Sequence, residues 1–232
     1  DGVSYEFAQD IIEKVSKEYT LSKEHQYIFA GLPSETEHNM SQLYIDSGTV
    51  VKDKQDREAY LLKQNKDKSI GFIDLEKVNE TSDKEHYLIC SYKDPDKLGE
   101  TYQHKALKYF DLVAGIFATK IEQLFKNGYQ NVYLVTDHGF VLTGILDNSD
   151  KIEVDFKGNV KISERFIRSE NKQKIDTNLL IEKEVVYNNF NYSYFAKRLG
   201  PFKSTGVYGF SHGGLSPQET IIPFLKWSND NN

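Results

Sequence analysis

The chain has 232 residues, 38% of them hydrophobic and 28% charged, which suits one sizeable domain with a packed core. Its formal net charge of -6 excludes a general attraction to nucleic acid or anionic membranes, so an anionic substrate would need a local site. Its single cysteine excludes an internal disulfide, and no apolar run approaches membrane-spanning length. We therefore expect a cytoplasmic protein without membrane contact.

The first part of the chain alternates helical and extended patterns. Apolar spacing over residues 7–15 predicts a helix, and residues 27–30 read as a short strand. A Gly- and Pro-containing turn then leads into a predicted helix over 36–44. The charged segment 46–68 predicts a solvated excursion, with a short helix around residues 57–62.

The middle of the chain predicts a strand, a long helix and a second strand. The strands are 86–92 and 132–135, and the helix is 107–124, ended by Asn127-Gly128. This βαβ pattern predicts a parallel sheet with a right-handed crossover. Residues 94–100 are predicted to form a loop, because Pro and Gly bracket them.

The remainder predicts more strands within a single domain that spans residues 1–232. Residues 152–156 and 160–162 alternate about a Gly-Asn turn and predict a hairpin, inside an insertion at 148–190. Residues 184–187 and 220–225 are further predicted strands. A first strand is also expected upstream of Asp1.

Polar residues gather where predicted strands and loops end. Asp137-His138 follows strand 132–135 directly, and adjacent carboxylate and imidazole groups suit a divalent metal. The other polar clusters are Asp1, Thr36, Asp96 with Glu100, and His212. Each has a simpler reading, since Thr36 could be only a helix cap and Asp96 could only close a turn. Their order along the chain is more specific than any one of them.

That order resembles the alkaline phosphatase superfamily and, more closely, the PglZ family of BREX-type phage-defence systems, over nearly the whole chain. The stretches that carry the resemblance are Asp1-Gly2-Val3-Ser4-Tyr5-Glu6, Leu32-Pro33-Ser34-Glu35-Thr36, Asp96-Lys97-Leu98-Gly99-Glu100, Thr136-Asp137-His138-Gly139-Phe140 and Tyr208-Gly209-Phe210-Ser211-His212-Gly213-Gly214-Leu215-Ser216-Pro217-Gln218-Glu219. The last of these is the most specific to PglZ.

The resemblance implies an α/β fold, namely a three-layer αβα sandwich with a mostly parallel sheet. It also implies two divalent ions, with Zn²⁺ expected and Mn²⁺ as the alternative. One ion would be held by Asp96, Glu100 and His212, and the other by Asp1, Asp137, His138 and the Thr36 oxygen. Glu100 stands where most of the superfamily has His, which favours harder ions such as Mn²⁺.

The expected activity is metal-dependent hydrolysis of phosphoric esters, with Thr36 as nucleophile and a phosphothreonine intermediate. Asn39, one helical turn after Thr36, and Arg165 are expected to contact the phosphoryl group, with Arg168 as a weaker candidate. A nucleotide or short oligonucleotide is the expected substrate, and other defence proteins are the expected partners. Two alternatives remain open: a metal-binding scaffold or nucleotide-sensing module without strong catalysis, and phosphomutase or sulfatase chemistry on the same scaffold.

Overall fold

A computed structural model describes residues 1–24, 26–45, 49–79, 85–142, 150–202 and 209–230. The helices are α1 (Tyr5–Lys14), α2 (Thr36–Tyr44), α3 (Lys54–Gln64), α4 (Asp94–Tyr102), α5 (Leu107–Lys126) and α6 (Pro217–Thr220), with 3₁₀ turns η1 (Leu75–Lys77) and η2 (Gln103–Ala106). The strands are β1 (Thr20–Leu21), β2 (Tyr27–Phe29), β3 (Ile70–Asp74), β4 (Tyr87–Ser91), β5 (Asn131–Val135), β6 (Val141–Leu142), β7 (Val160–Ile162), β8 (Phe166–Ser169), β9 (Leu180–Tyr187), β10 (Phe190–Ala196), β11 (Phe210–Ser211) and β12 (Ile221–Ser228).

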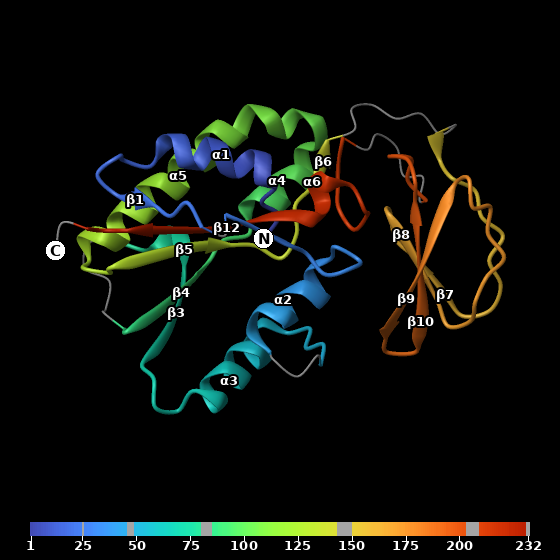
Figure 1. Cartoon of the computed structure of the whole chain (residues 1–232), viewed down its shortest axis with the longest axis horizontal. Coiled ribbons are helices and arrows are strands. Elements are labelled where there is room, and N and C mark those ends of the chain that lie inside the picture. Colours follow the sequence, from blue (N-terminus) through green and yellow to red (C-terminus); the bar gives the residue numbers. More distant parts are fainter. Residues whose placement is uncertain (25, 46–48, 80–84, 143–149, 203–208, 231–232) are drawn as a thin grey trace.

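The last strand, β12, lies at the centre of the main sheet. It pairs with β5 along one side and with β1 and β2 along the other. Leu225 and Trp227 of β12 point into the main core, which helices α1 and α5 cover (Figure 1). Pro223 is tolerated in this central strand because the pairing with β5 begins only at Phe224, so no ladder hydrogen bond is lost on that side.

Helix α5 confirms the predicted long helix. Its apolar residues at alternating steps of three and four, such as Phe110, Phe117 and Ile121, are buried in the main core. It ends at Asn127, followed by Gly128 with a φ of +91°, as the Asn-Gly signal predicts. This helix packs against α1 and β5 and so fixes the strand that leads to Asp137.

The α/β class is confirmed, but a mostly parallel sheet is not. In the described residues β12 runs antiparallel to β1, β2 and β5, and the parallel pair is β3 with β4. The two strands of the predicted βαβ unit, β4 and β5, are therefore not paired with each other in the described residues. Strand β4 pairs with β3, and β5 pairs with β12. Strand β12, from the far end of the chain, pairs with β5 instead.

Two local predictions around the parallel pair were wrong. Strand β3 was not predicted, because its Ile-Gly-Phe-Ile pattern is short and interrupted by Gly71. Residues 94–100 form the first part of helix α4 rather than a loop. Pro95 stands in the first turn of that helix, where its missing N–H costs nothing, so it starts the helix instead of breaking it.

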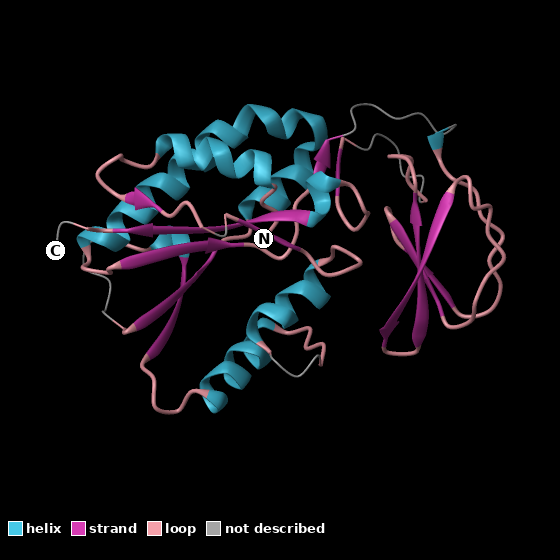
Figure 2. Ribbon diagram, in the orientation of Figure 1, coloured by secondary structure: helices cyan, strands magenta, loops and turns pink. Residues whose placement is uncertain are grey.

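A second sheet, of order β7-β8-β10-β9 among the described residues, lies beside the main body (Figure 1). Figure 2 shows that this part consists mainly of strands and loops. It has its own small core, formed by Ile167, Leu180, Tyr194, Ala196 and Phe202. We name it the small sheet.

The predicted hairpin in this region was misplaced. Val160–Ile162 pairs antiparallel with Phe166–Ser169, and not with residues 152–156. Strand β10 was also missed, although the turn before it contains Asn188 with a φ of +53°, a conformation that Asn adopts readily in hairpins. The limits of an insertion at 148–190 and the single-domain boundary stay predictions.

Within the described ranges, no helix combines the length and the apolar character needed to cross a membrane.

Gly139, shortly after β5, lies close against the backbone of the short helix α6. Its N–H donates to the Glu219 carbonyl at 3.0 Å, and a Cβ at this position would lie 2.1 Å from the Gln218 carbonyl oxygen. We therefore expect Gly139→Ala to lower the free energy of unfolding by ~1–3 kcal/mol, measured by urea denaturation. Gly115→Ala is the matched control, because no described atom lies within 4 Å of its Cβ position. In helix α5 that change should stabilise the protein by ~0.5–1 kcal/mol, and equal effects of the two changes would contradict the close approach.

Candidate metal centre

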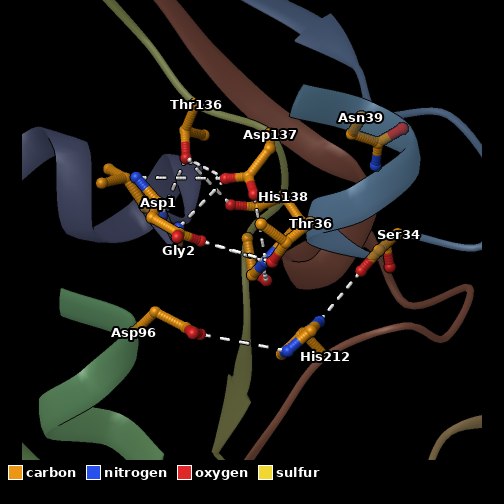
Figure 3. A network of polar contacts seen from close by, with 12 residues as sticks. Asp1, Gly2, Ser34, Thr36, Asn39, Asp96, Thr136, Asp137, His138 and His212 are labelled. Atoms are coloured by element: carbon orange, nitrogen blue, oxygen red, sulfur yellow. Dashed lines mark hydrogen bonds and ion pairs between the residues drawn. The ribbon is translucent and has the colours of Figure 1, made fainter. Parts of the chain in front are cut away.

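The structure brings six of the seven predicted metal ligands to one place (Figure 3). They come from five separate elements or their ends. The six are Asp1 before α1, Thr36 at the start of α2, Asp96 in the first turn of α4, Asp137 and His138 after β5, and His212 after β11. Residues up to 211 positions apart along the chain therefore share one small volume.

Two groups of side chains could each hold an ion. Asp1, Asp137 and His138 form one group, and the ligand atoms within it lie within 4.8 Å of one another. Asp96, His138 and His212 form the other under the same limit. The shared residue, His138, is fully buried, and its ring stacks on that of His212 with centroids 3.9 Å apart.

Glu100 does not belong to either group in the described part of the chain. It lies one helical turn after Asp96 on α4, but its side chain is exposed. Its role as a metal ligand stays a prediction. In the structure, the third residue beside Asp96 and His212 is His138, whereas the sequence analysis expected Glu100 in that group.

Both histidines are held in the tautomer that a metal ligand needs. His138 Nδ1 lies 3.0 Å from the Gly139 carbonyl oxygen, and His212 Nδ1 lies 3.1 Å from that of Ser34. A carbonyl oxygen can only accept, so each Nδ1 carries the proton. Nε2 of each ring then carries the lone pair and faces the cluster, as in histidines that bind metals.

The cluster contains more acceptors than donors. Asp137 Oδ1 accepts from Gly2 N and Thr136 Oγ1, but its buried Oδ2 has no hydrogen-bond donor among the described residues. That oxygen lies 3.4 Å from His138 Nε2, which is itself an acceptor. Asp96 Oδ1 is likewise buried and without a donor in the part of the chain described. Buried acceptors that face one another are costly unless a cation lies between them, so these residues fit divalent ions.

Protonation states agree with this arrangement. Burial lowers the pKa of His138 to about 4, so its ring is neutral at neutral pH. Burial alone would raise the pKa of Asp137, but the neighbouring His138 and the hydrogen bond from Thr136 hold it below its ordinary value. At neutral pH the site therefore presents an ionised carboxylate beside an uncharged imidazole.

Asp96 gives the site a predicted pH dependence. Burial raises the pKa of Asp96 to about 6, with the charges of Glu100 and Asp137 adding to the effect and His212 opposing it. Below that pH a proton competes with the ion for the carboxylate, so Zn²⁺ affinity should fall as the pH drops through about 6. Asp96→Asn should weaken binding and reduce the slope of log affinity against pH by about one. Calorimetric Zn²⁺ titrations across this range check the prediction, and an unchanged slope would mean that Asp96 is not a ligand.

Thr36 is placed for a role other than helix capping. The N-cap of α2 is Glu35, and Thr36 is the first helical residue. No side chain in the described ranges caps this helix. The Thr36 hydroxyl instead lies 3.1 Å from His138 Nε2 and 3.5 Å from Asp1 Oδ1. It is therefore both at the metal cluster and beside the N-terminal amides of a helix.

The loop that carries His212 is held by residues that the sequence reading did not identify. Ser34 Oγ donates to the Gly214 carbonyl and accepts from Gly213 N, both at 3.1 Å. Buried Glu219 accepts from Gly214 N at 2.8 Å and forms a capping box with Ser216. The spacing Ser216 to Glu219 is a recognisable capping-box signal that could have indicated this anchor.

The two predicted phosphate-contacting residues are engaged elsewhere. Arg165 is buried, with Nε and Nη2 paired to the two carboxylate oxygens of Glu219 and Nη1 donating to the Leu199 carbonyl. These contacts give Arg165 a structural role at the His212 loop, and its phosphoryl contact stays a prediction. Asn39 is also buried, and its side-chain amide donates to the Gly31 carbonyl at 3.2 Å. Within the described residues no hydrogen bond or ion pair joins either side chain to a residue of the cluster.

An α/β domain with two joined groups of carboxylate and imidazole ligands beside a helix-terminal hydroxyl is typical of alkaline phosphatase-like proteins. Comparison with known proteins supports this class. A family model described as the BREX system PglZ alkaline phosphatase-like domain matches residues 96–227. The chain therefore belongs to the PglZ family.

A curated relative extends the similarity to the rest of the chain. The alkaline phosphatase-like protein PglZ of Bacillus cereus (strain H3081.97) is 23% identical over 257 aligned residues, which include 99% of this chain. The chain spans about 30% of the length of that relative.

Proposed function

We propose that this domain hydrolyses phosphoric esters, with Thr36 as the nucleophile and two divalent ions as cofactors. The observation that supports this most is the position of the Thr36 hydroxyl, 3.1 Å from His138 Nε2 in a cluster of otherwise unsatisfied acceptors. A site that served only to hold a structural ion would have no use for a hydroxyl at a free helix end.

The groups that would hold the ions are Asp1, Asp137 and His138 with Thr36, and Asp96 with His212, His138 and the predicted Glu100. When bound, such ions would neutralise phosphoryl charge and favour ionisation of a neighbouring hydroxyl. Zn²⁺ is the first candidate for a mixed carboxylate and imidazole set, and Mn²⁺ is the alternative.

The chain's own residues would then orient the reaction. The Thr36 hydroxyl has acceptors on two sides, in His138 and Asp1, and either can take its hydrogen bond. The first-turn amides of α2 are available to phosphoryl oxygens because no described side chain caps that helix. Attack by the Thr36 oxygen on phosphorus would break the bond to the leaving alcohol and give a phosphothreonine, which water hydrolyses.

A phosphodiester or nucleotide is proposed as the substrate, and phage defence as the setting, on the basis of family membership. The chain is net acidic, so a nucleotide or short oligonucleotide fits better than a long nucleic acid. Other proteins of the same defence system are the proposed partners. The proposed location is the cytoplasm.

The test is release of p-nitrophenol from mono- and bis-p-nitrophenyl phosphate by purified protein with Zn²⁺ or Mn²⁺. We expect turnover that chelator removes and either metal restores, with the diester at least as good a substrate as the monoester. Metal binding without hydrolysis of either ester would favour the alternative of a scaffold or sensing module.

A further inference from the structure

The small sheet contacts helix α2 on both sides of Thr36. Arg168 of β8 forms an ion pair with Glu35, the residue before Thr36. Tyr187 of β9 donates its hydroxyl hydrogen to Glu37, the residue after Thr36, at 2.5 Å. Both contacts join residues more than 130 positions apart in the chain.

These two contacts reinforce each other. The Arg168 guanidinium carbon lies 3.7 Å from the centre of the Tyr187 ring, so the two side chains stack. Arg168 is fully buried and Tyr187 nearly so, at 4% exposure. Because buried groups have few alternative rotamers, Arg168 and Tyr187 are rigid partners for Glu35 and Glu37. Glu37 also pairs with the exposed Lys52 at 3.3 Å.

The arrangement has a cost that packing alone does not explain. Arg168 Nε and Nη1 are buried and have no hydrogen-bond partner among the described residues. An arginine with unsatisfied buried N–H groups is unfavourable for folding, even when its charge is balanced by a carboxylate. A sheet selected only for stability would place an apolar residue here.

The geometry of the helix explains what the contacts achieve. Glu35 is the extended N-cap residue before the helix, and Glu37 projects about 100° around the helix axis from Thr36, so the two carboxylates hold the first turn from either side of Thr36. Holding both neighbours fixes the rotation of the first turn about the helix axis. That rotation decides whether the Thr36 hydroxyl faces His138 and Asp1 or turns away from them.

We propose that Arg168 and Tyr187 are positioning residues, through which the small sheet holds the Thr36 hydroxyl in the metal cluster. We call the two contacts, Arg168 with Glu35 and Tyr187 with Glu37, the clamp. The expected effect of the clamp on turnover rests on the proposed function, but its effect on the order of α2 does not. Its direct consequence is a rigid first turn of α2, which amide hydrogen exchange measures in the absence of any substrate.

The test uses Tyr187→Phe, which keeps the ring under Arg168 and removes the hydroxyl that bonds Glu37. We expect the amides of residues 39 and 40, whose hydrogen bonds close the first turn, to exchange about tenfold faster, while those of α5 are unchanged. Turnover should fall on the order of tenfold in kcat with little change in KM, because a misplaced nucleophile slows the chemical step rather than substrate binding. Glu37→Gln should have a similar effect, and combining the two changes should add little.

Tyr194→Phe is the matched control. It removes a buried tyrosine hydroxyl from the same sheet, one that accepts from Gln173 N at 2.8 Å and does not contact α2. It should leave both the exchange of α2 and kcat unchanged. Arg168→Lys keeps the charge without the planar stack, and its effects should resemble those of Tyr187→Phe.

The outcomes separate this inference from the proposed function. If the wild-type protein hydrolyses no ester but Tyr187→Phe loosens α2, the proposed function fails and the clamp is supported. Unchanged exchange in α2 overturns the clamp, whatever the activity. Faster exchange with undiminished kcat in an active enzyme shows that the contact does not position Thr36, and likewise overturns the inference.

Discussion

Thr36→Ala is expected to lower kcat for ester hydrolysis by at least ~1,000-fold, the scale of loss seen when an enzyme loses its nucleophile. The fold should persist, because the Thr36 side chain is half-buried and its hydroxyl contacts only the cluster among the described groups. Metal should still bind at that group, more weakly, since Asp1, Asp137 and His138 remain.

Thr36→Ser is the control for this prediction. It keeps the hydroxyl and should retain most of the turnover, whereas a structural threonine would be replaced equally well by Ser or Ala. The measurement is a steady-state rate with circular dichroism on each variant. Near-normal turnover in Thr36→Ala would remove Thr36 from the reaction.

Asp137→Asn is expected to abolish function while leaving the stability of the metal-free protein nearly unchanged. In the wild type, Asp137 Oδ2 faces the acceptor nitrogen of His138 at 3.4 Å without a donor from the described residues. An amide nitrogen at that position could donate to His138, while the remaining oxygen still accepts from Gly2 and Thr136. The metal-free variant should therefore keep its stability to urea within ~1 kcal/mol, because the hydrogen bond gained at His138 offsets the weakening of the bonds from Gly2 and Thr136 to a carboxylate whose pKa lies below its ordinary value.

The same change removes a negative ligand from the metal centre. We expect Zn²⁺ affinity to fall at least ~100-fold and ester hydrolysis to be lost. Asp111→Asn is the matched control, because that carboxylate, on α5, is 86% exposed and forms a surface ion pair with Lys14 of α1. A loss of stability larger than ~1 kcal/mol in metal-free Asp137→Asn would contradict the acceptor surplus on which the metal assignment depends.

The sequence predicted local structure best where a pattern repeats. Helix α5 shows its apolar face over five turns, so its limits were predicted almost to the residue. Helix α4 was missed because Pro95 and Gly99 are loop formers in isolation, while a Pro in the first helical turn is favourable. The antiparallel place of β12 between β2 and β5 depends on contacts across the whole chain, which no local pattern carries.

The candidate ligands could be predicted because each lies at the end of an element and their order resembles a known family. The residues that hold these ligands in place could not be predicted. Arg165 with Glu219 and Arg168 with Glu35 are buried pairs joined only by folding, and a lone arginine in sequence looks like a surface residue. The same limit explains why neither the contacts of Arg165 with Glu219 nor the position of His138 beside Asp96 and His212 was predicted.

The most direct test of a two-metal centre is anomalous X-ray scattering from crystals of the protein grown with Zn²⁺ and, separately, with Mn²⁺. The account predicts two anomalous peaks at the cluster. One should be bounded by Asp1, Asp137 and His138, and the other by Asp96 and His212. The account would be contradicted if crystals grown with excess metal showed no anomalous peak between these side chains, or showed peaks only elsewhere on the protein.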